Sequence, residues 1–244
     1  ASGQGIHKET PTMRKTATAL FALVLVVSTA AVALAANPVR ISQVYGGGGN
    51  TGATYQNDYV ELFNNSGSAV SIGGWSLQYG SATGTVNLGA CTYCLTVIPA
   101  GATIPPCGYY LIQLKAGTIA APPLPVTPDL IVPNATANNL SASSGKIGLK
   151  ADALTTPCVP QTAFVDLVGF GTANCNETAN AGGMSNSSMA VRNGDGTADT
   201  DNNSADFTVV TAAVPHNSAS PANPGCLATP ALPKSWGSVK TLYR

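Results

Sequence analysis

The sequence has few charged side chains. They make up 9% of its 244 residues, against roughly 25% in an ordinary soluble protein. Eleven basic and eleven acidic residues leave the formal net charge at zero, and no stripe of Lys or Arg runs along the chain. A protein that holds nucleic acid through its phosphates needs such a stripe. Nucleic acid is therefore not expected as a partner.

Histidine is scarce, and the motifs of catalysis are missing. The chain has two histidines and no Gly-x-Ser-x-Gly elbow, His-Glu-x-x-His pair, Walker loop or Rossmann glycine pattern. His216 has no carboxylate nearby in the sequence to orient it, so we interpret it as a surface loop residue. The glycines at 46–49 follow a strand-like run but open no helix, which indicates a flexible hairpin tip rather than a phosphate loop. We expect a protein that is not an enzyme.

An apolar segment near the start has the layout of a secretory signal peptide. Met13, Arg14 and Lys15 form a short positive region, an apolar run follows, and small residues at Ala33 and Ala35 give a cleavage pattern. A membrane-spanning helix is the alternative, but no basic stop-transfer residues follow the run. We expect residues 1–12 to have no role in the fold, residues 13–35 to be removed, and the protein to be secreted or held at the cell surface.

All six cysteines follow this leader, and an even number suits disulfides in an oxidising compartment. They are Cys91, Cys94, Cys107, Cys158, Cys175 and Cys226. Sequence alone cannot choose among the pairings, but Cys158 and Cys175 bracket a strand-like run and are predicted to pair. Cys91-Thr-Tyr-Cys94 has the spacing of a redox or metal pair. No βαβ pattern, second CxxC or nearby His supports that alternative, so we interpret it as a structural disulfide.

The mature part alternates short apolar runs with segments rich in Gly, Asn and Pro. The runs at 40–45 and 58–63 alternate apolar and polar residues with the period of a strand. Further strands are expected at 70–72, 73–79, 95–98, 109–114, 146–150, 164–170, 189–192 and 207–210. No long stretch favours a helix, and 116–139 reads as an extended crossover. The pattern predicts an all-β fold, an antiparallel β-sandwich.

Several of these segments, taken in order, resemble the lamin tail domain. The resemblance rests chiefly on Glu-Leu-Phe-Asn at 61–64 followed by Gly-Gly-Trp at 73–75. It is extended by the rest of 57–64 and 70–79 and by 41–50, 98–102, 108–111, 165–171, 188–192 and 199–207. It covers roughly residues 37–221 and implies an immunoglobulin-like β-sandwich of the type found in secreted bacterial proteins, with no catalytic role of its own. We place this domain at 36–222 and a linker with a C-terminal tail at 223–244.

Three side chains are expected to support the fold rather than a reaction. Trp75 follows two glycines and is predicted to fill the core between the sheets. Glu61 lies among apolar neighbours in a strand, so it needs a partner, either Arg192 or backbone amides. Asp166 is expected to point outward into solvent.

One acidic segment, at 193–206, offers oxygen ligands to a cation. Asp195, Asp199 and Asp201 are a candidate calcium site, because Ca²⁺ binds six to eight oxygens from flexible loops. The spacing does not match an EF-hand. The alternative is a turn-rich loop in which the Asp and Asn side chains accept hydrogen bonds from backbone amides.

Two functions remain after these exclusions. The first is a secreted interaction or structural module that presents loops or a sheet edge to an extracellular protein, glycan or polymer. The second is an accessory unit that holds substrate for, or targets, a secreted hydrolase such as a nuclease. The tail adds one further hypothesis: Trp236, Val239, Leu242 and Tyr243 fall on one face of a short helix that docks a sorting or surface partner. The alternative for the tail is a frayed terminus.

Overall fold

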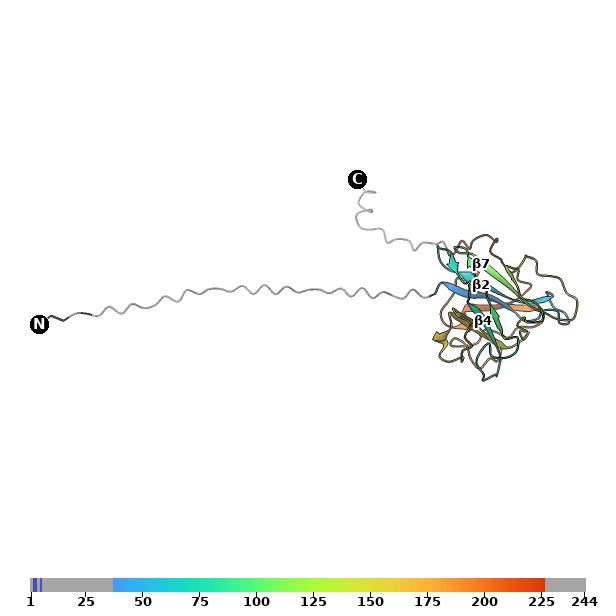
Figure 1. Cartoon of the computed structure of the whole chain (residues 1–244), viewed down its shortest axis with the longest axis horizontal. Coiled ribbons are helices and arrows are strands. Elements are labelled where there is room, and N and C mark those ends of the chain that lie inside the picture. Colours follow the sequence, from blue (N-terminus) through green and yellow to red (C-terminus); the bar gives the residue numbers. More distant parts are fainter. Residues whose placement is uncertain (1, 4, 6–36, 227–244) are drawn as a thin grey trace, which may run out of the picture. The chain divides into compact units, whose positions relative to one another are not determined.

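The chain folds into two stacked β-sheets. The computed structural model describes residues 2, 3, 5 and 37–226, so the predicted signal peptide and the predicted tail helix lie outside the described residues. The first sheet has six strands in the order β12-β11-β1-β2-β7-β8, and the second has four in the order β10-β9-β4-β5. Figure 1 shows the layer with β2 and β7 above the layer that holds β4. The predicted all-β sandwich is confirmed.

The predicted strands are present with small shifts at their ends. The six-stranded sheet contains β1 (Val39–Tyr45), β2 (Asn57–Asn64), β7 (Tyr109–Ala116), β8 (Leu130–Ile131), β11 (Ser188–Arg192) and β12 (Phe207–Thr211). The four-stranded sheet contains β4 (Ser76–Ser81), β5 (Leu95–Val97), β9 (Gly145–Lys150) and β10 (Asp166–Phe170). A separate pair consists of β3 (Val70–Ser71) and β6 (Thr103–Ile104). Neither β6 nor β8 was predicted.

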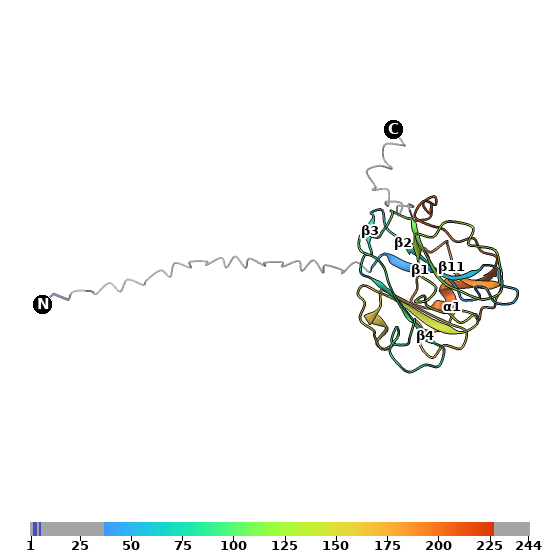
Figure 2. The same cartoon turned by 45° about the vertical axis from the view of Figure 1, so that its right-hand side comes forward.

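Neighbouring strands within the sheets run antiparallel, except that β8 lies parallel to β7. This strand lies inside the predicted crossover. Helical structure in the described part is confined to a 3₁₀ turn, Gln161–Ala163, and one turn of α-helix, α1 (Asn203–Asp206). The helix α1 contacts both β10 and β12, one strand from each sheet, and is visible in Figure 2. It therefore lies where the two sheets meet.

The main core lies between the sheets. Ile41 and Val44 of the first sheet and Leu77, Ile147 and Val168 of the second belong to it. The pairing of β1 with β2 shifts register between residues 41 and 43. Because of this shift, Ile41 and Val44 both face the core although they are three residues apart, which a regular strand would not allow. Trp75 packs against this core but is only partly buried. The prediction that Trp75 fills the core between the sheets is therefore wrong, because this side chain covers the margin of the core.

Both outer faces of the sandwich are also covered by apolar side chains. Tyr45, Tyr59 and Met189 form a second cluster on the six-stranded sheet, together with Leu124 from the crossover. A third cluster consists of Leu88, Phe164, Leu167 and Cys175, from β10 and the loops that cover the four-stranded sheet. The strands are thus apolar on both faces. The alternation of apolar and polar residues along a strand is therefore weak, and it does not tell reliably which residues face the core.

The four glycines at 46–49 are buried, so their interpretation as a flexible hairpin tip is wrong. A Cβ on Gly47 would lie 2.5 Å from the carbonyl oxygen of Asn186, and one on Gly48 would lie 2.2 Å from the backbone nitrogen of Asp58. The Asp58 carboxylate accepts hydrogen bonds from the amides of Gly48 (2.8 Å) and Leu140 (2.9 Å). Glycine is required here because other segments of backbone come too close for any side chain.

Three disulfides link the cysteines, in the pairs Cys91–Cys94, Cys107–Cys226 and Cys158–Cys175. The predicted pairing of Cys158 with Cys175 is confirmed. The Cys107–Cys226 bond spans 119 residues and attaches the C-terminal segment to the turn before β7. Disulfides of this number favour an extracellular or periplasmic location. In the part of the chain that the structure describes, no helix combines the length and apolar character needed to cross a membrane.

Candidate functional site

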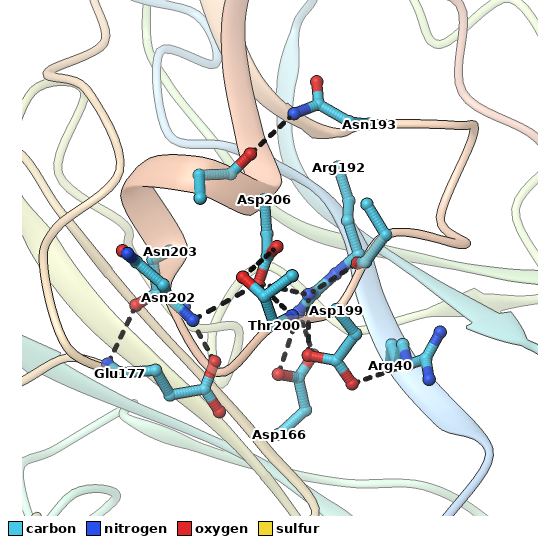
Figure 3. Close-up of polar contacts among 12 residues, drawn as sticks. Arg40, Asp166, Glu177, Arg192, Asn193, Asp199, Thr200, Asn202, Asn203 and Asp206 are labelled. Carbon is cyan, nitrogen blue, oxygen red and sulfur yellow. Dashed lines mark hydrogen bonds and ion pairs between the residues drawn. The ribbon is translucent and has the colours of Figure 1, made fainter.

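Arg192, at the end of β11, lies fully buried between the two sheets. Its Nη2 is 2.9 Å and 2.7 Å from the two carboxylate oxygens of Asp166 on β10, and its Nε donates to the carbonyl oxygen of Ile41 at 2.8 Å. Figure 3 shows the guanidinium among its carboxylate partners. Asp166 faces inward with Val168 and Phe170, so the expectation that it points into solvent is wrong.

The same arginine organises the acidic segment. Its Nη1 donates to the carbonyl oxygen of Ala198 at 3.1 Å and to Asp199 at 3.3 Å. The other carboxylate oxygen of Asp199 lies 2.8 Å from Nε of Arg40. The guanidinium also lies over the ring of Phe207, 4.5 Å from its centre. Two arginines of the protein therefore supply the positive charge that this segment needs.

Asp206 of α1 holds the segment from the other end. Its carboxylate accepts hydrogen bonds from the amide of Thr200 (2.9 Å) and its hydroxyl (2.8 Å), and from the amide of Asn202 (3.3 Å). Asn202 in turn caps α1 by accepting from the amide of Ser204. The turn-rich alternative, in which acidic and amide side chains satisfy backbone amides, describes this loop.

The structure does not gather Asp195, Asp199 and Asp201 into a metal site. Among residues 37–226 and the few described before them, no three His, Cys, Asp or Glu side chains lie close enough together to hold a metal ion. Asp199 is held by two arginines. Asp195 accepts hydrogen bonds from Tyr109 and Asn223 through its carbonyl oxygen, while Asp201 lines a pocket with Glu177 and Thr178. We therefore do not propose calcium binding.

That pocket, of about 440 Å³, lies next to Glu177 and is lined also by Gln161, Thr162 and Phe164. The carboxyl group of Glu177 accepts from the amide of Leu167 (3.3 Å) and from Nδ2 of Asn203 (2.9 Å). Burial, followed by the nearby charge of Asp166, raises the pKa of Glu177 to about 8. The polar side chains of the pocket lining are Gln161, Thr162, Glu177, Thr178 and Asp201.

Glu61 pairs with His216, not with Arg192 as one of our alternatives had it. Its fully buried carboxylate accepts hydrogen bonds from the Ser42 hydroxyl (2.6 Å) and the His216 amide (2.5 Å), and Nδ1 of the ring lies 3.3 Å away. The expectation that Glu61 accepts a backbone amide is confirmed. The interpretation that no carboxylate orients His216 is wrong, because Glu61 does so. The sequence did not indicate this pair, since the two residues are 155 positions apart.

The Glu61–His216 pair fixes the C-terminal segment to the sheet. The imidazole stacks on the ring of Tyr109 with centres 4.4 Å apart, and its hydrogen bond to Glu61 raises the pKa of His216. The Ser42 hydroxyl donates to Glu61 rather than to the imidazole. The arrangement therefore lacks the serine–histidine hydrogen bond that nucleophilic catalysis requires.

A groove on the outer side of the four-stranded sheet is lined by apolar side chains. We call it the valine groove; it has a volume of about 280 Å³ and is formed by residues 84–86, 146, 157–159, 174 and 175. Val86 is 65% exposed and Val159 is 67% exposed. The Cys158–Cys175 disulfide fixes the loop that carries Val159. The sequence analysis missed this groove, and its only signal was a valine in each of two polar loops.

The family model described as Lamin Tail Domain matches residues 33–204. The chain belongs to the lamin tail domain family. Among solved structures, a DUF4876 family protein from Bacteroides thetaiotaomicron is similar to it, with 14% sequence identity, a TM-score of 0.51 and 71% of each chain covered. At this identity the likeness shows a common fold and nothing about activity. No curated protein matches the chain.

In this lamin tail domain, the segments that carry the family resemblance build the sandwich. Gly48 allows a close backbone crossing, Glu61 holds the C-terminal segment, and Trp75 covers the edge of the core. Arg192, at the end of the 188–192 segment, joins the two sheets. The residues of the valine groove lie outside those segments, although the family model spans them.

Proposed function

We propose that this lamin tail domain is an exported, non-catalytic module that binds an extracellular protein through the valine groove. The observation that carries the proposal is the pair of exposed valines, Val86 and Val159, which line the same groove. Exposed apolar side chains that cluster beside a concavity are typical of protein contacts. The family and the fold support a module without catalysis of its own.

The lining of the groove favours a protein over a glycan or a charged polymer. Of its residues, Val86, Pro157 and Val159 are apolar, and none is aromatic, so no ring is present on which a sugar could stack. Lys146 is its single basic residue and is buried, so the groove offers no row of cations to a polyanion. An extended segment with small apolar side chains suits this chemistry.

Export is supported by two independent features. The signal-peptide layout at 13–35 is a property of the sequence. The three disulfides leave no free cysteine in the described part of the chain, and such pairing persists in oxidising compartments. A partner is therefore sought in the culture medium or at the cell surface.

A capture experiment with matched variants tests the proposal. The immobilised protein is incubated with culture medium of the producing organism, and bound proteins are quantified by mass spectrometry. We expect the double variant Val86→Ser, Val159→Ser to lose at least one specific extracellular protein, with binding reduced roughly tenfold or more. The control is Ile131→Ser, Val214→Ser, which removes two β-branched apolar side chains of similar exposure, 57% and 56%.

The proposal fails if the groove variant and the control capture the same proteins to the same extent. If the protein that depends on the valines is a hydrolase, the domain is an accessory unit of that enzyme, which is the second function considered from the sequence. If it has no hydrolase activity, the first function holds.

A further inference from the structure

The Cys91–Cys94 disulfide joins an exposed cysteine to a buried one. Cys91, Thr92 and Tyr93 are exposed, whereas Cys94 is buried. The loop is tight: the amide of Cys94 donates to the carbonyl oxygen of Cys91 at 3.1 Å, and Tyr93 has a φ of +61°, which non-glycine residues rarely adopt. Exchange with an external thiol needs a sulfur that can be reached and a second sulfur that leaves, and this loop supplies both.

A buried lysine lies in the same small pocket as Cys91. The pocket, of about 100 Å³, is lined by Cys91, Lys146, Tyr79 and Val86 among others. The Lys146 ammonium is bound by two neutral acceptors, the carbonyl oxygen of Gly84 at 2.6 Å and the side-chain oxygen of Asn174. The ion pairs formed by the described residues do not include it.

This surrounding gives Cys91 the environment of a reactive thiol. A cation without a counter-charge stabilises a thiolate in a shared pocket, and the effect is strong where little water reaches the charge. Neither of the other two disulfides has an exposed cysteine. Cys107 is fully buried and Cys226 partly buried, and the Cys158–Cys175 bond, which also shares a pocket with Lys146, joins a partly buried cysteine to a buried one.

We propose that Cys91–Cys94 is a thiol–disulfide exchange site, whose substrates are thiols and disulfides of extracellular proteins. This role goes beyond the binding function proposed above. An external thiolate attacks Sγ of Cys91, the Cys91–Cys94 bond breaks, and Sγ of Cys94 leaves with the electron pair and takes a proton. A second external thiolate then displaces Cys91 from the mixed disulfide. The products are one external disulfide and the reduced pair, with the Cys91 thiolate stabilised by Lys146.

The reverse direction uses the same groups. The Cys91 thiolate attacks an external disulfide, and Cys94 resolves the mixed disulfide, so that two electrons pass from the cysteine pair to the external sulfur pair. The cycle is closed by any dithiol or disulfide of suitable potential, and glutathione serves as the probe.

The first test uses the full chain in native buffer. The protein is equilibrated with glutathione at stepped ratios of reduced to oxidised form, free thiols are alkylated, and modified cysteines are identified by mass spectrometry. We expect Cys91 and Cys94 to be modified at a ratio at least tenfold more oxidising than the ratio that opens Cys107–Cys226 or Cys158–Cys175. Opening of all three bonds together, or of Cys91–Cys94 last, overturns the proposal.

The second test measures the alkylation rate of Cys91 against pH after selective reduction. We expect a midpoint below the value of about 8.5 for an ordinary cysteine, and a shift of about one pH unit upward in Lys146→Met. The control Lys150→Met removes a lysine from the same strand, β9, that is paired with Asp152, and should leave the midpoint unchanged. A wild-type midpoint at or above that of an ordinary cysteine overturns the proposal even if Lys146→Met does not fold.

Discussion

Arg192 on β11 and Asp166 on β10 form an ion pair that joins the two sheets, with Nη2 of the arginine 2.7 Å from the carboxylate oxygen. Both side chains are almost fully buried. The amide of Ile41 on β1 donates to the same carboxylate at 2.5 Å, and the carbonyl of Ile41 accepts from Nε of Arg192. The pair is therefore part of a closed set of hydrogen bonds at one end of the core, which satisfies the condition for burying two charges.

Removing Arg192 is expected to destabilise the domain strongly. In Arg192→Met the Asp166 carboxylate stays buried without its partner, and we expect a loss of about 3–5 kcal/mol in the free energy of unfolding. Urea denaturation followed by tryptophan fluorescence measures it. The control Lys150→Met breaks an ion pair in which Asp152 is half exposed, and should cost less than about 1 kcal/mol. Equal losses of unfolding free energy in the two variants would show that the buried Arg192–Asp166 pair contributes no more to stability than an exposed ion pair.

The disulfides are expected to differ in stabilising effect according to the length of chain they close. Cys107–Cys226 closes a loop of 119 residues and Cys158–Cys175 one of 17. Constraint of the unfolded chain predicts about 4–5 kcal/mol for the long loop and about 3 kcal/mol for the short one. The double variants Cys107→Ala, Cys226→Ala and Cys158→Ala, Cys175→Ala are compared by denaturation. The opposite order would contradict this explanation.

Gly48→Ala tests the packing of the glycine run. The new Cβ would lie 2.2 Å from the backbone nitrogen of Asp58 and 2.3 Å from the carbonyl carbon of Asn57, and backbone atoms cannot move aside cheaply. We expect a loss of about 3 kcal/mol or more, or failure to fold. Gly67→Ala is the control, because nothing lies within 4 Å of its Cβ. It should change stability by no more than about 0.5 kcal/mol. A tolerated Gly48→Ala would restore the flexible-tip interpretation.

Glu177 is expected to make stability fall as the pH rises. Its pKa is raised from 4.5 to about 8 in the folded protein, so the folded state binds a proton that the unfolded state releases. The stabilisation from this proton is complete below pH 4.5 and is lost as the pH rises through about 8. The variant Glu177→Gln carries no such proton. Its stability relative to wild type should therefore increase across this interval, by up to about 5 kcal/mol, since each unit of pKa shift is worth about 1.4 kcal/mol.

Denaturation of wild type and Glu177→Gln at a series of pH values measures this difference. His216 shifts wild-type stability in the same direction, because its pKa is also raised in the folded state. Both proteins contain His216, so the difference between them isolates Glu177. A difference that stays constant from pH 5 to pH 9 would show that the Glu177 carboxyl is already ionised in the folded protein at neutral pH.

The strands could be predicted from the sequence because each is short, rich in alternating or β-branched residues and bounded by Gly, Asn or Pro. The runs at 40–45 and 58–63 became β1 and β2 with an extra residue or two. The face that each residue occupies was harder to predict. Asp166 is predicted to face solvent, whereas it lies between the sheets and its neighbour Leu167 packs under the outer loops.

The polar partners could not be predicted because they are distant in sequence. Glu61 and His216 are 155 residues apart, and Arg192 and Asp166 come from different sheets. Nothing local marks such a pair, since the pairing depends on how the sheets stack and on where the C-terminal segment crosses them. The same holds for the valine groove and for the pocket shared by Cys91 and Lys146, whose walls come from strands and loops that are far apart in the sequence.

The bond between Cys226 and Cys107 also decides how tension is carried through the domain. A pull applied to whatever follows residue 226 passes through the two sulfur atoms to the turn that precedes β7, an inner strand of the six-stranded sheet. The 118 residues between the two cysteines, including β9 to β12, lie off this covalent line. A load on the C-terminal end is thereby transmitted without peeling β12 from the edge of its sheet.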